Sequence, residues 1–248
     1  MKAEAVVEYL VNWLREQVKA AGASGVVLGV SGGVDSAVAA AIAKRAFPDN
    51  CMALLMPCES NLDDLLHGQA FVEEFNIPYR IVDLDNAFNL LSAQLGSYIK
   101  HEGPKGKLLR ANIKPRLRML TLYYSAQGRE YLVLGTSNKS EIIVGYATKY
   151  GDTGVDLQII GDLVKKEIYE LARYLQIPAR IINKAPSGGL WEGQTDEGEM
   201  GITYDQLDEY ITTGQAEPDI IKHIENMIKK SEHKRRLVPV ARIPRDGD

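Results

Sequence analysis

The sequence predicts an α/β protein with an open, mostly parallel, doubly wound sheet and helices on both of its faces. Short apolar runs rich in Val, Leu and Ile alternate along the chain with segments of helical periodicity. The apolar runs are continuous rather than interleaved with polar residues, as is typical of parallel strands that are covered on both sides. No linker rich in Pro, Gly or Ser divides the 248 residues, so we expect a single domain over residues 1–248.

The expected elements follow one another in a regular order. The strands are short and apolar, and they are expected at residues 25–30, 51–57, 79–84 and 131–136. The helices are expected at residues 6–18, 34–47, 62–75, 86–98, 108–127, 205–213 and 219–230, with another beginning near residue 165. Because strand and helix alternate repeatedly, right-handed crossovers between parallel strands are expected.

Composition excludes several classes of protein. Lys and Arg total 29 against 33 Asp and Glu, a mildly acidic balance that disfavours nucleic acid or an anionic membrane as a partner. Cys51 and Cys58 form no Cys-x-x-Cys motif, which fits a reducing cytoplasm. Charges such as Glu8 and Arg15 interrupt the N-terminal helix, so it is neither a signal peptide nor a membrane span. The basic stretch 233–245 is open to three interpretations, namely an RNA-binding arm, a solvated terminus or a phosphate clamp.

The stretch "VLGVSGGVDS" at residues 27–36 carries the first chemical signal. A strand that ends in Ser-Gly-Gly and enters a helix directly presents unpaired backbone N–H groups and the positive end of a helix dipole to an anion. A plain strand-to-helix turn is the alternative. Asp35 either stabilises the helix dipole or carries Mg²⁺ to phosphates. The loop lacks the Lys of a P-loop and the third Gly of a dinucleotide fingerprint.

A second block, "LGTSNKSEIIVGYATKYGDTGVD", follows the strand expected at residues 131–136. Glu141 is the best candidate for a carboxylate beside Asp35, although Ser137, Ser140 and Glu141 could simply cap a helix. Carboxyl ends of parallel strands meet at one edge of a sheet, and ligands bind there where the strand order reverses. We therefore expect both blocks to lie at that edge.

Ser-Gly-Gly-x-Asp-Ser resembles the pyrophosphate-binding loop of the N-type ATP pyrophosphatases. The block around Glu141, together with residues 112–119, residues 185–208 and "HKRR" near the end, resembles the NAD synthetases in order along nearly the whole chain. The resemblance implies an adenine nucleotide alpha hydrolase-like fold without a glutaminase domain. It further implies that ATP adenylates the nicotinate carboxylate of deamido-NAD and that ammonia then displaces AMP to give NAD, with pyrophosphate released in the first step.

The resemblance also implies the site residues. ATP is expected at Gly29, Val30, Ser31, Gly32, Gly33, Val34, Asp35, Ser36, Thr136, Lys165 and Ser187. Deamido-NAD is expected at Arg116, Lys149, Asp156, His233 and Lys234. Mg²⁺ is expected at Asp35 and Glu141, and the expected catalytic residues are Asp35, Glu141, Asp152 and Lys165. Because Asp152 stands in a loop between the expected Mg²⁺ ligand and the expected substrate residues, we hypothesise that it takes a proton from ammonium; the alternative is that it orients the nicotinate ring.

Four further expectations concern the nitrogen donor, the oligomeric state, one loop and the rival functions. Free ammonia is the expected nitrogen donor unless a separate glutaminase subunit supplies it, and a homodimer is expected because family members form one. The segment 187–201 is expected to close over substrate, with an ordinary surface loop as the alternative. The rival functions are a tRNA-modifying ATP pyrophosphatase and a non-catalytic adenine-nucleotide sensor.

Overall fold

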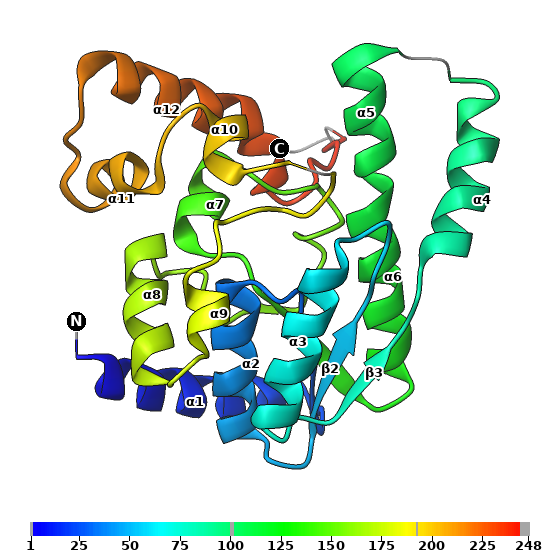
Figure 1. The fold of residues 1–248 in the computed structure, drawn as a ribbon. Helices are drawn as coiled ribbons and strands as arrows, with labels where there is room; N and C mark the ends of the chain where they lie inside the picture. Colours follow the sequence, from blue (N-terminus) through cyan, green and yellow to red (C-terminus); the bar gives the residue numbers. More distant parts are fainter. Residues whose placement is uncertain (1, 100–101, 192, 244–248) are drawn as a thin grey trace.

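A five-stranded parallel sheet forms the centre of the molecule (Figure 1). The structure is a computed structural model that describes residues 2–99, 102–191 and 193–243. The strands are β1 (Gly25–Gly29), β2 (Cys51–Leu55), β3 (Tyr79–Ile81), β4 (Tyr131–Gly135) and β5 (Leu157–Gln158), in the spatial order β3-β2-β1-β4-β5. The chain runs outward from β1 to β3 and then returns to place β4 on the other side of β1. The strand order therefore reverses between β1 and β4, where a ligand site is expected.

Helices surround this sheet. They are α1 (Ala3–Ala20), α2 (Val34–Ala46), α3 (Leu62–Glu74), α4 (Asp85–Gly96), α5 (Gly103–Ala111), α6 (Ile113–Gln127), α7 (Lys139–Val144), α8 (Lys165–Tyr174), α9 (Ala179–Ile182), α10 (Asp196–Met200), α11 (Tyr204–Thr213) and α12 (Pro218–Ser231). A short 3₁₀ helix at Glu232–Lys234 follows α12. No helix in the described part of the chain is both long and apolar enough to cross a bilayer.

Both faces of the sheet are covered, which confirms the predicted doubly wound arrangement. Val26 and Leu28 of β1 belong to the core that contains α1, α2 and α8. Val27, between them, belongs to a second core with Phe88 of α4 and Leu122 of α6. Successive residues of a strand point to opposite faces, so a strand buried on both sides must be apolar at every position. This requirement explains the continuous apolar run.

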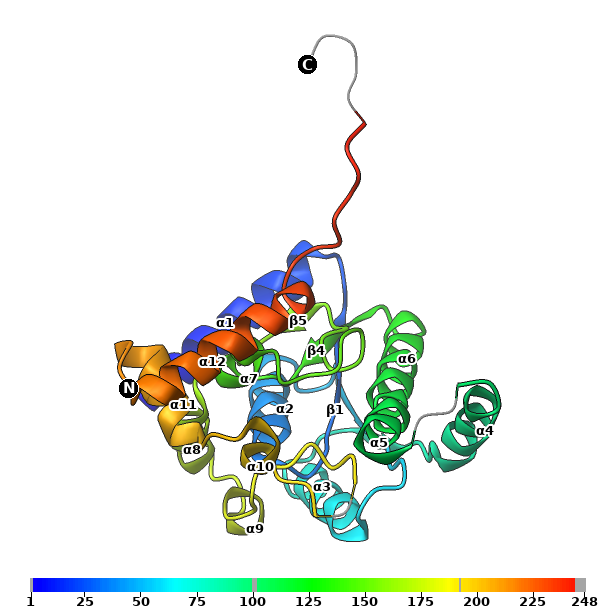
Figure 2. The same ribbon diagram turned by 90° about the horizontal axis from the view of Figure 1, so that it is seen from above.

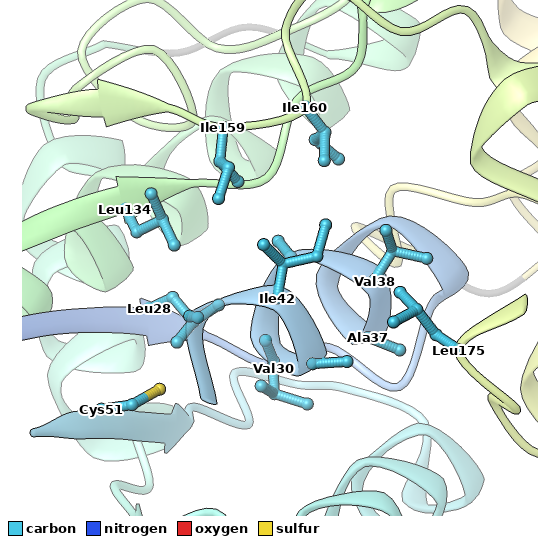
Figure 3. Packing of buried hydrophobic residues seen from close by; sticks show 14 of the residues in the cluster. Leu28, Val30, Ala37, Val38, Ile42, Cys51, Leu134, Ile159, Ile160 and Leu175 are labelled. Atoms are coloured by element: carbon cyan, nitrogen blue, oxygen red, sulfur yellow. The ribbon is translucent and has the colours of Figure 1, made fainter. Parts of the chain in front are cut away.

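Helix α2 packs closely on the sheet because its sequence is rich in alanine. Ala37 and Ala39 to Ala41 are buried, and small side chains let the helix axis approach the strands. Figure 3 shows Val38 and Ile42 of α2 among Leu28, Leu134 and neighbouring apolar residues of the sheet and its flanking helices. The helix thus holds its own N-terminus firmly at the carboxyl end of β1.

The predicted single helix over residues 108–127 is wrong, because the structure has two helices that meet at Asn112. Pro115 supplies the physical reason. It has no N–H to donate, and its ring would clash with the carbonyl of Ala111 in a continuous helix, whereas the first turn of a new helix tolerates it. The break places Asn112 where its Oδ1 accepts a hydrogen bond from Thr148 Oγ1 at 2.8 Å.

A third apolar cluster lies beyond the carboxyl edge of the sheet. Val144 of α7, Leu207 of α11 and Ile224 of α12 are buried together there. Figure 1 shows α10, α11 and α12 above that edge, and Figure 2 shows the chain after the 3₁₀ helix extending away from the body. Pro244 and Arg245, the last residues of the predicted basic stretch, lie outside the described residues.

Candidate active site

A cavity of about 600 Å³ opens at the carboxyl edge of the sheet, between the loops that follow β1 and β4. The loop after β2, helix α6, residues 184–190 and the 3₁₀ helix complete its wall. Most residues predicted for the site line it, and they are Gly29, Val30, Ser31, Gly33, Val34, Asp35, Ser36, Arg116, Thr136, Glu141, Lys149, Asp152, Lys165, Ser187, His233 and Lys234. Gly32 and Asp156 do not belong to the lining.

The loop between β1 and α2 is braced by its two serines. Ser36 Oγ donates to the carbonyl of Gly33 at 2.9 Å and accepts from the Ser31 amide at 3.2 Å. Ser31 Oγ accepts from the Gly33 amide at 3.2 Å. No side chain caps the N-terminus of α2, so its first-turn N–H groups face the cavity without a capping acceptor from the described residues. This end of α2 has the geometry of an anion site.

Gly32 is the point at which the loop packs against α3. Its φ is +77°, and a Cβ built on it would lie 2.3 Å from the carbonyl oxygen of Asp64 in α3. Both the left-handed backbone and the close approach require glycine. Gly32 therefore lets the loop lie directly against α3, although Gly32 itself does not line the cavity.

Asn138 connects the two acidic residues that were predicted to hold Mg²⁺. It is fully buried, and its Nδ2 donates to Asp35 Oδ1 at 2.9 Å. Its Oδ1 accepts from the Glu141 amide at 3.0 Å, while the Asn138 amide donates to Glu141 Oε2 at 3.3 Å. This is a capping box that begins α7 and directs Glu141 toward the loop after β1. Glu141 therefore both caps a helix and faces the cavity, so the two interpretations of the sequence are compatible.

Lys165 reaches the same acidic pair from the start of α8. Its side chain is 3% exposed, and its Nζ lies 2.5 Å from Asp35 Oδ2. Burial acts to lower the pKa of Lys165, but the carboxylates of Asp35 and Glu141 outweigh it and raise that pKa. The lysine is thus a fixed positive charge at the floor of the cavity.

Further carboxylates and phenols surround Glu141. Tyr204 Oη lies 3.0 Å from Asp196 Oδ2 and 3.3 Å from Glu141 Oε1. Tyr146 Oη lies 3.1 Å from Asp196 Oδ1. Burial, followed by the negative charge of Asp35, raises the pKa of Glu141, and burial also raises the pKa of Asp196. The site concentrates negative charge beside one lysine, which is an arrangement that a bound cation would stabilise.

Basic residues also line the cavity. Arg116 Nε donates to the carbonyl of Lys149 at 3.3 Å, so these two predicted deamido-NAD residues are adjacent. Lys234 Nζ donates to the carbonyls of Gly145 and Ala147, each at 2.7 Å, and burial lowers its pKa. The Arg116 and Lys234 side chains thus donate to backbone carbonyls, and neither forms an ion pair with a carboxylate of the described residues.

The two remaining acidic residues predicted for the site, Asp152 and Asp156, lie in different environments. Asp152 lines the cavity, and its Oδ2 accepts from the Thr148 amide at 2.8 Å. Asp156 instead accepts from Tyr123 Oη at 3.0 Å and from the Val133 amide at 2.7 Å. Both carboxylate oxygens of Asp156 are therefore engaged within the fold, at the junction of β4 and the strand beside it.

Asn138, Asp196 and Tyr204 were not predicted from the sequence. Asn138 had a readable signal, since it stands three residues before Glu141 and has the residue type of an N-cap. Asp196 and Tyr204 had none, because only the packing of α10 and α11 beyond the edge of the sheet brings them beside Glu141. Local pattern carries no information on such long-range placement.

The parallel sheet, the reversal of strand order and the glycine loop at the switch point together define an α/β protein of the adenine nucleotide alpha hydrolase-like class. Residues 6–238 match the family described as NAD synthase, and the chain belongs to that family. This membership confirms the resemblance detected in the sequence.

Individual relatives agree with the family. An NH(3)-dependent NAD(+) synthetase from Syntrophomonas wolfei is 67% identical over 98% of both chains. A solved structure titled NMN synthetase from Francisella tularensis superposes with a TM-score of 0.92 at 34% identity, covering 98% of this chain and all of that one. An NH3-dependent NAD synthetase from Campylobacter jejuni superposes with a TM-score of 0.80 at 31% identity, again covering 98% of this chain and all of that one.

Proposed function

We propose that the chain is a C–N ligase that amidates deamido-NAD with ammonia at the expense of ATP, releasing AMP and pyrophosphate in the last step of NAD biosynthesis. The observation that carries the proposal is the junction, within one cavity, of an uncapped helix N-terminus, an acidic pair with a buried lysine, and a wall of basic side chains. Membership of the NAD synthase family gives this combination of groups its chemical meaning.

The two halves of the cavity suit the two steps of the reaction. A carboxylate is a poor electrophile because its oxygen leaves poorly. Attack of that oxygen on the α-phosphate of ATP expels pyrophosphate, which the N–H groups of the loop 29–36 and the positive charge of Lys165 would stabilise. Ammonia then attacks the carbonyl carbon and AMP departs with the former carboxylate oxygen. Arg116, Lys149 and Lys234, which line the same cavity, would hold the phosphates of the dinucleotide.

Mg²⁺ fits the acidic end of the cavity. Asp35 and Glu141 are oxygen donors connected by one asparagine, and the pKa of Glu141 is raised by burial and by the neighbouring carboxylate. Mg²⁺ is commonly held by one or two carboxylates together with substrate phosphates. When bound, it would neutralise charge on the departing pyrophosphate. Asp35 and Glu141 would be its protein ligands.

Ammonium must lose a proton before it can attack, and Asp152 is the proposed base. It lines the cavity, and its Oδ1 accepts no hydrogen bond from the described residues, so that oxygen is available to an ammonium ion. Free ammonia is the proposed donor. The alternative in which Asp152 orients the nicotinate ring predicts no change in the apparent affinity for ammonium when this carboxylate is removed.

Nicotinate mononucleotide is a second candidate acceptor, because the structure that superposes with a TM-score of 0.92 is titled NMN synthetase. It carries the same reacting carboxylate but lacks the adenylyl half of deamido-NAD. Competition between the two acceptors in one assay distinguishes them. A higher kcat/KM for deamido-NAD supports the proposal. A higher kcat/KM for the mononucleotide would make the mononucleotide the acceptor, with the same adenylation and amidation steps.

A homodimer in the cytoplasm is also proposed. Leu120 and Tyr124 lie one turn apart on α6 and are 62% and 82% exposed, so together they offer an apolar strip to a second copy. Light scattering with size-exclusion chromatography tests the dimer, and Leu120→Lys should shift its dissociation to higher protein concentration. Cys51 and Cys58 are unpaired, which supports a reducing compartment.

The decisive experiment supplies ATP, MgCl₂, ammonium and deamido-NAD and separates the products by chromatography. Equal amounts of NAD, AMP and pyrophosphate are expected. Formation of ADP, or turnover only when RNA is added, would rule out the proposal. Replacing ammonium with glutamine should abolish NAD formation, because the ligase uses free ammonia.

A further inference from the structure

Two loops contribute to the same side of the cavity, and one buried lysine touches both. The first loop, residues 56–61, connects β2 to α3 and contributes Met56, Pro57 and Ser60 to the wall. The second segment, residues 185–191, follows α9 and contributes Ala185 through Leu190. In the described part of the chain no hydrogen bond joins the loop 56–61 directly to the segment 185–191. A hydrogen-bonded or ionic link between the two loops must therefore pass through a third part of the chain.

Lys114 provides this link. It stands in the first turn of α6 and is 3% exposed. Its Nζ donates to the carbonyl of Leu190 at 2.9 Å and lies 3.4 Å from Glu59 Oε2. The ring of Phe88 lies beside the same ammonium, with its centroid 5.2 Å away. A buried ammonium is strongly unfavourable without polar partners, so the position of Lys114 depends on both loops being in place.

The surrounding residues keep these partners in position. Glu59 has a φ of 45°, an uncommon backbone conformation for a residue other than glycine, and Arg110 of α5 pairs with its other carboxylate oxygen at 2.5 Å. Lys107 of α5 lies 4.5 Å from the centroid of the Trp191 ring. The start of the segment is held separately, since Lys184 forms an ion pair with Asp64 of α3. At the far end of the segment the Leu190 amide donates to Gln194 Oε1 at 2.7 Å, and among these contacts Lys114 is the one that also reaches the loop 56–61.

We infer that Lys114 is a positioning residue that couples the loop 56–61 to the segment 185–191, so that both cover the cavity together and exclude water while the carboxylate is adenylated. The inference rests on the proposed function. If the cover loosens, water can attack the carbonyl carbon of the adenylated carboxylate. AMP then leaves with the bonding electron pair, the free acid returns and a proton is released, so ATP is consumed without NAD being formed.

The test compares Lys114→Met with Lys44→Met in the full-length protein. Methionine keeps the unbranched side chain beside Phe88 but removes the charge and the donor. Lys44 is a matched control, because its Nζ also donates to a backbone carbonyl, that of Pro48, at the far end of α2 and outside the cavity lining. Thermal unfolding checks that both variants fold.

Two measurements are made on each protein. The first is the ratio of AMP to NAD formed, which should be unity for the wild type and for Lys44→Met and should rise at least twofold for Lys114→Met. The second needs no turnover and follows chymotrypsin cleavage after Leu190 and Trp191 with ATP and Mg²⁺ present. Loss of a hydrogen bond from a charged donor should increase cleavage on the order of tenfold. Unchanged cleavage together with a ratio of unity in Lys114→Met overturns the inference.

A failure of the proposed function can be distinguished from a failure of the coupling by Lys114. If the wild type makes no NAD, the proposed function is wrong, while the cleavage comparison still tests whether Lys114 holds the segment. If Lys114→Met does not fold, Glu59→Gln replaces it, since it removes only the half-exposed carboxylate partner. Glu59→Gln should increase cleavage less than Lys114→Met would, and cleavage equal to that of the wild type would contradict the coupling.

Discussion

Gly32→Ala tests whether the loop 29–36 is fixed by its contact with α3. The new Cβ would lie 2.3 Å from the carbonyl oxygen of Asp64, at a backbone φ of +77°. Gly22→Ala is a matched control, because Gly22 has a φ of +67° but a Cβ there would meet nothing within 4 Å. A left-handed backbone costs an alanine about 1–2 kcal/mol, so Gly22→Ala should lose only that amount of stability.

The steric contact adds a second cost at Gly32. Overpacking against a backbone atom that cannot rotate away typically costs about 1–3 kcal/mol, so Gly32→Ala should lose about 2–5 kcal/mol in total. Urea unfolding of the two variants, followed by circular dichroism, measures the difference as a shift in midpoint at constant slope. Isothermal titration should also show weaker ATP binding for Gly32→Ala alone, because the displaced loop would no longer present its N–H groups. Equal destabilisation of the two variants would refute the reasoning.

Three further predictions address individual side chains. Asn138→Ala should destabilise the fold by about 1–2 kcal/mol through loss of the α7 cap, and it should also weaken the binding of Mg²⁺ with ATP. Asn138→Asp should retain the cap. Thermal unfolding measures the stability of each variant, and isothermal titration measures its binding of Mg²⁺ with ATP. Asp152→Asn should lower kcat/KM for ammonium about 10²–10⁴-fold and change its pH dependence, and an unchanged ammonium profile would exclude a role as base. Glu141→Gln tests how the stability of the fold depends on pH. The pKa of Glu141 is raised above its usual 4.5, so the wild type should lose stability as pH rises from 4.5 toward the raised pKa. Glu141→Gln should lose less stability over the same range. Parallel curves of melting temperature against pH for the two proteins, from pH 5 to 8.5, would contradict this.

The sequence predicted the sheet and its ligand edge well because both follow from local signals. The strand β1 is apolar at nearly every position, and the glycine loop after it enters an alanine-rich helix, so strand, turn and helix are all specified within about twenty residues. The helix break at Asn112 was equally readable, since Pro115 cannot occupy a helix interior. Periodicity alone concealed it, because the apolar spacing continues across the break.

The parts of the site that could not be predicted depend on distant contacts. Asp196 reaches Tyr204 and Tyr146 only because α10 and α11 fold back over the edge of the sheet. Lys114 stands in an ordinary helical sequence, and its burial depends on Glu59 and Leu190, which lie 55 residues before it and 76 residues after it. Asp156 shows the converse, since a residue type suited to ribose hydroxyls has both carboxylate oxygens bonded within the fold.

Oxygen isotope transfer tests most directly whether the cavity transfers the adenylyl group of ATP to a carboxylate. Deamido-NAD labelled with ¹⁸O in its nicotinate carboxylate is incubated with ATP, Mg²⁺ and ammonium, and the products are analysed by mass spectrometry. The carboxylate oxygen that attacks the α-phosphate must leave with AMP, so AMP should carry one ¹⁸O atom and NAD should retain the other in its amide. Label in inorganic phosphate would show attack at the γ-phosphate and would contradict the account.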